Sequence, residues 1–307
     1  MRTRHLPFIV LLCLFVVAGV AYRDSGIITG GARLDARQAP AVPIAPFPNT
    51  DGSFKFAVLG DFGDNAPAQY QLAEQMAKLH ERFKFDTVVT VGDNLLGSER
   101  PQDFKTKFEV PYKPLLDAGV KFYASLGNHD AREQRYYKLF NMGGKLYYTV
   151  NPRPEICLFL LEATYPTPEQ FQWLENELKA SSSDWKIAVF HEPIYSSGGL
   201  HGSDLSLRKV LEPFFVKYNV SVVFSGHDHF YERVKPQQGI AYFVVGSGGE
   251  LRKGDIDRKS GLTAKGFDTD QAFLAAEIIG DQMYFSAISR SGQTVDSGVL
   301  MRRKITP

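Results

Sequence analysis

The segment Val222-Val223-Phe224-Ser225-Gly226-His227-Asp228-His229 joins a short apolar run of strand composition to a cluster of metal-binding side chains. Four earlier apolar runs end in the same way: 56–59 before Gly60-Asp61, 88–91 before Gly92-Asp93, 122–126 before Gly127-Asn128-His129, and 187–190 before His191. Ligands of open α/β sheets bind beyond the carboxyl ends of the strands. The pattern therefore predicts that five strand ends converge on one metal site.

The segments between these runs have helical patterns, at 66–83, 101–116, 132–140, 167–180 and 205–218. The sequence from Thr167 to Gln170 is typical of a helix start, with Thr167 as N-cap and Gln170 as its capping-box partner. After His229 the pattern changes to strands alone, at 240–246, 273–279, 282–289 and 295–302. We therefore expect an α/β fold with two packed sheets of mixed direction and helices on their outer faces.

The first 51 residues differ in composition from the rest of the chain. Residues 1–22 have a basic start, an apolar run and small residues before Tyr22, which predicts a signal peptide or an uncleaved N-terminal anchor. Residues 23–51 are rich in Pro, Gly and Ala and predict a linker, so the catalytic domain is expected at 52–304. We expect an exported protein, periplasmic or secreted, that contacts the membrane only if residues 1–22 stay attached.

The amino-acid composition limits the classes of ligand that the protein is expected to bind. A length of 307 residues with 44% apolar residues is sufficient for one large core. The 35 basic and 34 acidic residues give no clustered positive charge for nucleic acid, so we expect a small substrate. Cys157 lies in an apolar strand, where a buried and unreactive thiol is expected.

Carboxylate, amide oxygen and imidazole together suit a pair of metal ions, which need a shared carboxylate to offset their repulsion. The predicted ligands are Asp61 and His229 for the first ion, Asp93 as the bridge, and Asn128, His191 and His227 for the second. Alternate residues of an extended segment point the same way, so His227 and His229 can both face the cluster. The flanking glycines are expected to permit sharp turns after the strands.

Together these blocks resemble the five ordered blocks of the calcineurin-like metallophosphoesterases: Asp61-Phe62-Gly63, Gly92-Asp93-Asn94, Gly127-Asn128-His129-Asp130, His191 and Gly226-His227-Asp228-His229. Within that superfamily the chain is most similar to the tartrate-resistant (purple) acid phosphatases, because Gly63 stands where many relatives have a metal-binding histidine. The resemblance implies a four-layer α/β-β/α sandwich. It also implies a dinuclear centre, Fe with Zn, Mn or a second Fe, that hydrolyses phosphate monoesters.

One position departs from the purple pattern. Purple acid phosphatases have a metal-binding tyrosine three residues after the bridging aspartate, and here that residue is Leu96. Leucine cannot ligate, so we expect no purple charge-transfer band, a weaker preference for ferric iron, and a first site that is weaker or completed by water. Asp64 and Asn65 are candidates to replace the tyrosine.

The expected chemistry is in-line attack by a metal-bound hydroxide, with a histidine as proton donor to the leaving group. His129 and His201 match positions that in purple acid phosphatases contact the phosphate or assist the leaving group, and are the candidate catalytic residues. Asp130 is a candidate to orient His129. Two alternatives stay open: a phosphodiesterase or nucleotide hydrolase on the same centre, and a non-catalytic binding protein that has lost the first-site ligand.

Overall fold

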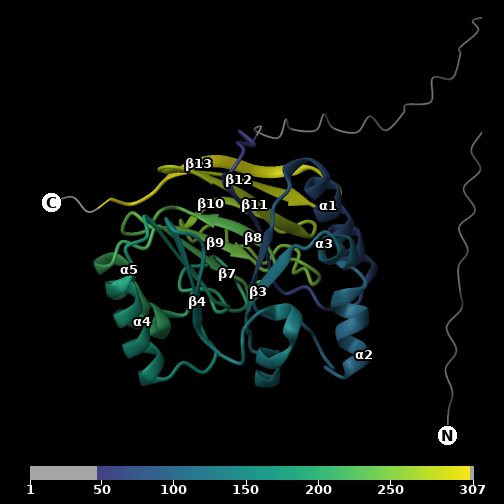
Figure 1. Ribbon diagram of the computed structural model, residues 1–307, viewed down its shortest axis with the longest axis horizontal. Coiled ribbons are helices and arrows are strands. Elements are labelled where there is room, and N and C mark those ends of the chain that lie inside the picture. The colour runs from purple at the N-terminus through teal and green to yellow at the C-terminus, as the bar shows by residue number, and fades with distance from the viewer. Residues whose placement is uncertain (1–46, 305–307) are drawn as a thin grey trace, which may run out of the picture. The chain divides into compact units, whose positions relative to one another are not determined.

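The computed structural model describes residues 47–304 (Figure 1). The predicted export segment 1–22 and residues 23–46 of the predicted linker lie outside the described residues. Within 47–304, no helix combines the length and the apolar character needed to cross a lipid bilayer.

Within residues 47–304, thirteen strands form two sheets. The first sheet has the order β13-β12-β11-β1-β2-β3, formed by β1 (Phe54–Leu59), β2 (Thr87–Val91), β3 (Lys121–Ser125), β11 (Ala272–Ile279), β12 (Gln282–Ser289) and β13 (Thr294–Met301). Strands β1, β2 and β3 are parallel to one another, and β11 to β13 form an antiparallel meander joined to β1.

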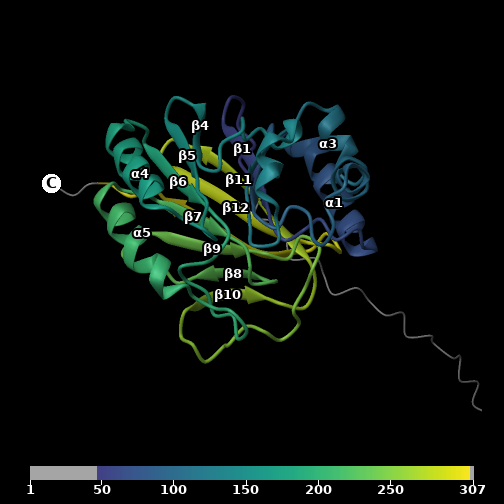
Figure 2. The ribbon, with the colours of Figure 1, turned by 90° about the horizontal axis from the view of Figure 1, so that it is seen from below.

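The second sheet has the order β10-β8-β9-β7-β6-β5-β4, formed by β4 (Tyr148–Arg153), β5 (Ile156–Leu160), β6 (Trp185–Val189), β7 (Val222–Ser225), β8 (Tyr231–Val234), β9 (Ala241–Val245) and β10 (Thr263–Phe267). Its four central strands β5, β6, β7 and β9 are parallel, and the others are antiparallel (Figure 2). Both sheets are therefore mixed, as the sequence predicts.

Helices cover the outer faces of both sheets (Figure 1). The helical elements are α1 (Pro67–Phe83), α2 (Pro101–Phe104), the π-helical turn η1 (Lys105–Glu109), α3 (Lys113–Asp117), the 3₁₀ turns η2 (Arg132–Tyr136) and η3 (Lys138–Phe140), α4 (Pro168–Ala180) and α5 (Leu205–Lys217). Leucines of α4 and α5 pack with the outward residues of β5 to β7 in one cluster, and α1 packs with the first sheet in another. The arrangement confirms the predicted four-layer sandwich.

The two sheets meet through buried aromatic rings. Phe56 of β1 lies 6.0 Å from Phe224 of β7, and Phe243 of β9 lies 5.1 Å from Phe285 of β12, both measured between ring centroids. Each fully buried phenylalanine contributes about 1.5–3 kcal/mol to the free energy of folding. These contacts hold the two sheets face to face.

Two predicted helices are wrong. Residues 101–116 form α2, η1 and α3 instead of one helix, because Pro111 and Pro114 lack the N–H that a continuous helix needs and restrict the residue before them. Residues 132–140 form two 3₁₀ turns. Each is short, and a short segment gains too few hydrogen bonds to offset the cost of nucleating an α-helix.

The start of α4 follows the sequence in part. Thr167 is the N-cap, since its side chain accepts a hydrogen bond from the Gln170 N–H at 3.3 Å. The side chain of Gln170 does not complete a capping box, because it pairs with both backbone groups of Glu162. Strands β4 and β10 were not expected, since both are edge strands of polar composition.

Candidate metal centre

The predicted ligands follow the carboxyl ends of parallel strands. Asp61 follows β1, Asp93 follows β2 and Asn128 follows β3, and these three strands pair in register. The pairing continues past the first two strands, since the Asp61 N–H donates to Gly92 O at 3.0 Å and the Phe62 N–H donates to Asp93 O at 3.2 Å. From the other sheet, His191 follows β6, and His227 and His229 follow β7.

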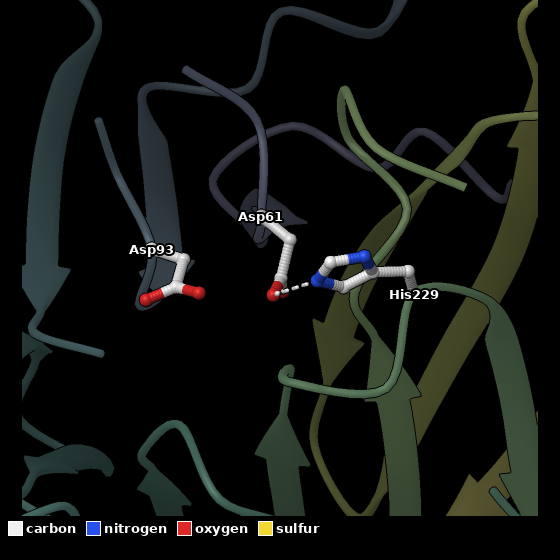
Figure 3. Close-up of side chains that lie close together, drawn as sticks. All are labelled: Asp61, Asp93 and His229. Carbon is white, nitrogen blue, oxygen red and sulfur yellow. Dashed lines mark ion pairs between the residues drawn. The ribbon is translucent and has the colours of Figure 1, made fainter. Parts of the chain in front are cut away.

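The first group of ligand atoms comprises Asp61, Asp93 and His229 (Figure 3). Each offers one atom, and these atoms lie within 4.8 Å of one another. His229 Nε2 is 3.3 Å from Asp61 Oδ1, and the three residues are at most 4% exposed. The structure therefore brings together the residues predicted for the first ion and the bridge.

The second group surrounds Nε2 of His191. This atom is 3.1 Å from Asn128 Oδ1, 3.2 Å from His227 Nδ1 and 3.4 Å from Asp93 Oδ2. His191 Nδ1 lies 2.9 Å from the carbonyl oxygen of Val91, which can only accept, so Nδ1 carries the proton of the neutral ring. Nε2 then presents a lone pair to two oxygen acceptors, an arrangement that a shared cation stabilises.

The charges at this position also fit a cation. Oδ2 of Asp93 is buried and has no hydrogen-bond partner among the described residues. Although burial opposes it, the carboxylates of Asp93 and Asp61 raise the pKa of His191 well above its ordinary value, so without a metal ion they favour a proton on Nε2, where a bound cation would otherwise supply the positive charge. Burial and the charge of His191 lower the pKa of His227 to about 3, so His227 stays neutral and keeps its lone pair. The donor set suits two metal ions, with Asp93 belonging to both groups.

The backbone is strained at three of these residues. Asp61, Asp93 and His227 have φ values of 53°, 48° and 69°, in the left-handed region that few residues other than glycine adopt. Such strain costs on the order of 1–3 kcal/mol per residue and concentrates at functional sites. The structure stores this energy to aim the three side chains into the centre.

Glycine is required next to them mainly because of close approach. A Cβ on Gly226 would lie 2.5 Å from Asp61 Oδ2, and one on Gly127 would overlap Asp93 Oδ1 and lie 2.8 Å from Cδ2 of His191. Among the four flanking glycines, Gly92 has a positive φ, of 93°, whereas Gly60, Gly127 and Gly226 do not. The expectation of sharp glycine turns therefore holds for Gly92, and the others leave room for the ligands.

Residues 54–231 match the family model of the calcineurin-like phosphoesterases. The chain belongs to this family. It is 24% identical to purple acid phosphatase 4 of Arabidopsis thaliana, over 84% of this chain and 86% of that protein. It is 23% identical to tartrate-resistant acid phosphatase type 5 of Homo sapiens, over 82% of this chain and 92% of that protein.

Two solved structures share the fold. One is the purple acid phosphatase PPD1 of yellow lupin (Lupinus luteus), with a TM-score of 0.68 and 19% identity over 84% of this chain and 55% of that chain. The other is GAP50, the anchor in the inner membrane complex of Plasmodium, with a TM-score of 0.68 and 19% identity over 82% of this chain and 90% of that chain. The family match makes the chain a metal-dependent phosphoesterase, and its donor set fits the dinuclear centre of that family.

Asp130 does not orient His129, contrary to the sequence expectation. Its carboxylate accepts hydrogen bonds from the backbone N–H groups of Asn94 at 2.9 Å, Leu95 at 3.1 Å and Gly127 at 2.9 Å. It thereby fastens the loop after β2 to the loop after β3. The backbone N–H of His129 donates to Asp93 Oδ1 at 2.9 Å, so the same two loops also meet at the bridging residue.

The two candidate catalytic histidines lie at the exposed side of the centre. The ring of His201 packs on His227, with 4.2 Å between centroids. The loop that carries His201 is held by Asp228, whose carboxylate accepts from Ser196 and from the Gly202 N–H at 3.5 Å. Asp228 points away from the ligands on either side of it. The imidazole of His129 is exposed.

Neither candidate replacement for the tyrosine joins the first group. The carboxylate of Asp64 accepts from the Ala66 N–H at 2.9 Å, and the Asn65 side chain accepts from Tyr70. Among residues 47–304, the metal-binding group contains no Asp64. Leu96 is half-buried, and its backbone pairs with Gly63.

Two residues that the sequence did not single out as functional contact the first group. Glu250 Oε2 lies 3.1 Å from Nδ1 of His229, and the Arg252 N–H donates to the His229 carbonyl at 2.9 Å. Both line a cavity of about 520 Å³ together with His229, Lys253 and Gln271. Nη1 of Arg252 is buried and has no partner in the part of the chain that the structure describes. The only sequence signal is their position directly after the Gly246-Ser247-Gly248-Gly249 motif.

Proposed function

We propose that this chain is an exported phosphatase that hydrolyses phosphate monoesters. Its two metal ions are held by Asp61 and His229, by Asp93 as the bridge, and by Asn128, His191 and His227. The observation that carries the proposal is the convergence of His191 Nε2, Asn128 Oδ1 and the unpartnered Asp93 Oδ2 beside the first group. A buried carboxylate oxygen without a donor, as at Asp93, is costly unless a cation lies beside it.

When bound, the two ions supply activated water as the nucleophile and neutralise charge on the phosphate. Fe with Zn, Mn or a second Fe is the proposed pair, and without a tyrosine at position 96 no purple charge-transfer band is expected. The chain itself orients the ester. Asn128, as an amide, adds no charge to the second site and leaves it attractive to an anion.

Three further residues are proposed to contact the substrate. Arg252 has a guanidinium nitrogen without a partner at a cavity beside His229, so it is placed to donate to a phosphate oxygen. A monoester has more charge on its terminal oxygens than a diester, which favours the monoester at a cationic site. His201 and His129 lie at the open side, where one of them delivers a proton to the departing alcohol.

The test is hydrolysis of p-nitrophenyl phosphate and of bis(p-nitrophenyl) phosphate by the purified protein, with Fe, Zn and Mn supplied singly and in pairs. Asp93→Asn is the inactive control, because it removes the charge shared by both groups. We expect faster turnover of the monoester, dependent on two ions. Faster turnover of the diester would instead support a phosphodiesterase or nucleotide hydrolase.

A non-catalytic binding protein is the second candidate. It is favoured by Leu96, and by the similarity in fold to a protein whose description names it an anchor. The retained donor set in both groups favours the enzyme. Absence of turnover with every metal pair, in protein shown to bind two ions per chain, would support the binding role.

A further inference from the structure

The first metal group has few protein ligands. Asp61, Asp93 and His229 supply one atom each, and no further His, Cys, Asp or Glu joins them within 47–304. Tetrahedral or larger coordination shells need four or more donors, so solvent would supply the rest. Tight binding here requires each of the three ligands to be well oriented and strongly donating.

His229 has a carboxylate on the nitrogen that faces away from Asp61. Its Nε2 lies 3.3 Å from Asp61 Oδ1, whereas its Nδ1 lies 3.1 Å from Glu250 Oε2. An ionised carboxylate can accept a hydrogen bond but cannot donate one, so Nδ1 of His229 is the donor. Nε2 is then left with its lone pair directed at the first group. A carboxylate in this position also increases the basicity of the imidazole.

The segment that carries Glu250 is fixed to both ligands by its backbone. The N–H groups of Gly249 and Glu250 donate to the carbonyl oxygen of Asp61 at 2.9 and 3.2 Å, and the Arg252 N–H donates to the carbonyl of His229 at 2.9 Å. The approach needs glycine, because a Cβ on Gly249 would lie 2.6 Å from the Phe62 carbonyl oxygen. The carboxylate is therefore held on a rigid support, although its side chain is 47% exposed.

We propose that Glu250 is a positioning residue for the first metal ion: it fixes the tautomer and ring orientation of His229 and strengthens Nε2 as a ligand. The inference rests on the proposed function in one respect, that the first ion binds to Asp61, Asp93 and His229. Loss of the partner of a metal-binding histidine typically weakens metal affinity about 10- to 100-fold.

The experiment titrates Co²⁺ into the metal-free protein by calorimetry and by its visible absorption. The variants are Glu250→Gln, which keeps an acceptor but removes the charge, and Glu250→Ala, which removes both. Glu81→Gln on the exposed side of α1 is the matched control. Melting temperatures of the metal-free forms show whether each variant folds.

We expect the native protein and Glu81→Gln to bind two Co²⁺ per chain. Glu250→Ala is expected to keep one site unchanged and to weaken the other about 10- to 100-fold, with Glu250→Gln between the two. Wild-type affinity at both sites in a folded Glu250→Ala protein would overturn the role of Glu250. Fewer than two ions in the native protein would instead contradict the proposed centre, so the two failures are distinguishable.

Discussion

Replacing Asp130 by alanine should destabilise the protein and weaken metal binding, although Asp130 is no predicted ligand. The substitution leaves three backbone N–H groups without an acceptor, those of Asn94, Leu95 and Gly127. An unsatisfied buried donor costs about 1–3 kcal/mol. Water reaches part of this site, because Asp130 is only partly buried, so we take the lower end for each group, about 3–4 kcal/mol in total.

For a domain of this size, that loss corresponds to a fall in Tm of roughly 6–16 °C. The assay is thermal unfolding followed by circular dichroism, in chelator, so that bound metal does not contribute. Asp117→Ala is the matched control, because Asp117 is exposed and pairs only with Lys113 one helical turn away, and it should change Tm by no more than about 2 °C. An Asp130→Ala protein that melts with the control would refute the reasoning.

Three other outcomes are expected. Gly127→Ala should abolish binding of the second metal ion, measured as metal content per chain, because its Cβ would overlap Asp93 and press on His191; a variant with full metal content would contradict this. Arg252→Ala should raise KM for p-nitrophenyl phosphate about 10-fold or more with a smaller change in kcat, and should weaken inhibition by inorganic phosphate in parallel; unchanged values would remove Arg252 from the site. Cys157 should resist alkylation by iodoacetamide at pH 8 until the protein unfolds, because burial raises the pKa of its thiol to about 11 and the thiolate is the reactive form. Rapid labelling of the native protein, absent in Cys157→Ala, would contradict it.

The sequence predicted the positions of these side chains because each predicted ligand is adjacent to its strand. Asp61, Asp93, Asn128, His191 and His227 follow apolar runs directly, so the rule for parallel sheets places them without knowledge of the loops. Cys157 is buried, as its apolar strand indicates.

The supporting residues could not be predicted in the same way. Glu250 reaches His229 across a loop of irregular structure, and no periodicity relates the two positions. The sequence predicts that Asp130 orients its neighbour His129. Its oxygens instead accept from backbone N–H groups of two loops, at Asn94 after β2 and at Gly127 after β3. Such contacts depend on tertiary structure, in which a side chain and its partner are brought together from separate segments.

The predicted helix boundaries were wrong where a local signal competed with the apolar pattern. Pro111 and Pro114 are visible in the sequence and break the helix expected at 101–116, whereas the apolar spacing alone suggests continuity. The sequence predicts that Gln170 caps its own helix. Its side chain instead forms two hydrogen bonds with the backbone N–H and carbonyl of Glu162.

The strand that precedes Asp61 lies between β2 and β11, and Phe54 of that strand pairs with Ile278. On that side its sheet consists of β11, β12 and β13, which are synthesised after all the predicted ligands. Long-range pairing of this kind forms late, because a large loop must close before any contact is gained. A ribosome-bound fragment that ends before β11 has every predicted metal ligand in its sequence but lacks the neighbour that fixes the first one. Metal acquisition should therefore follow the synthesis and pairing of β11, so that biosynthesis itself determines when the catalyst can become active.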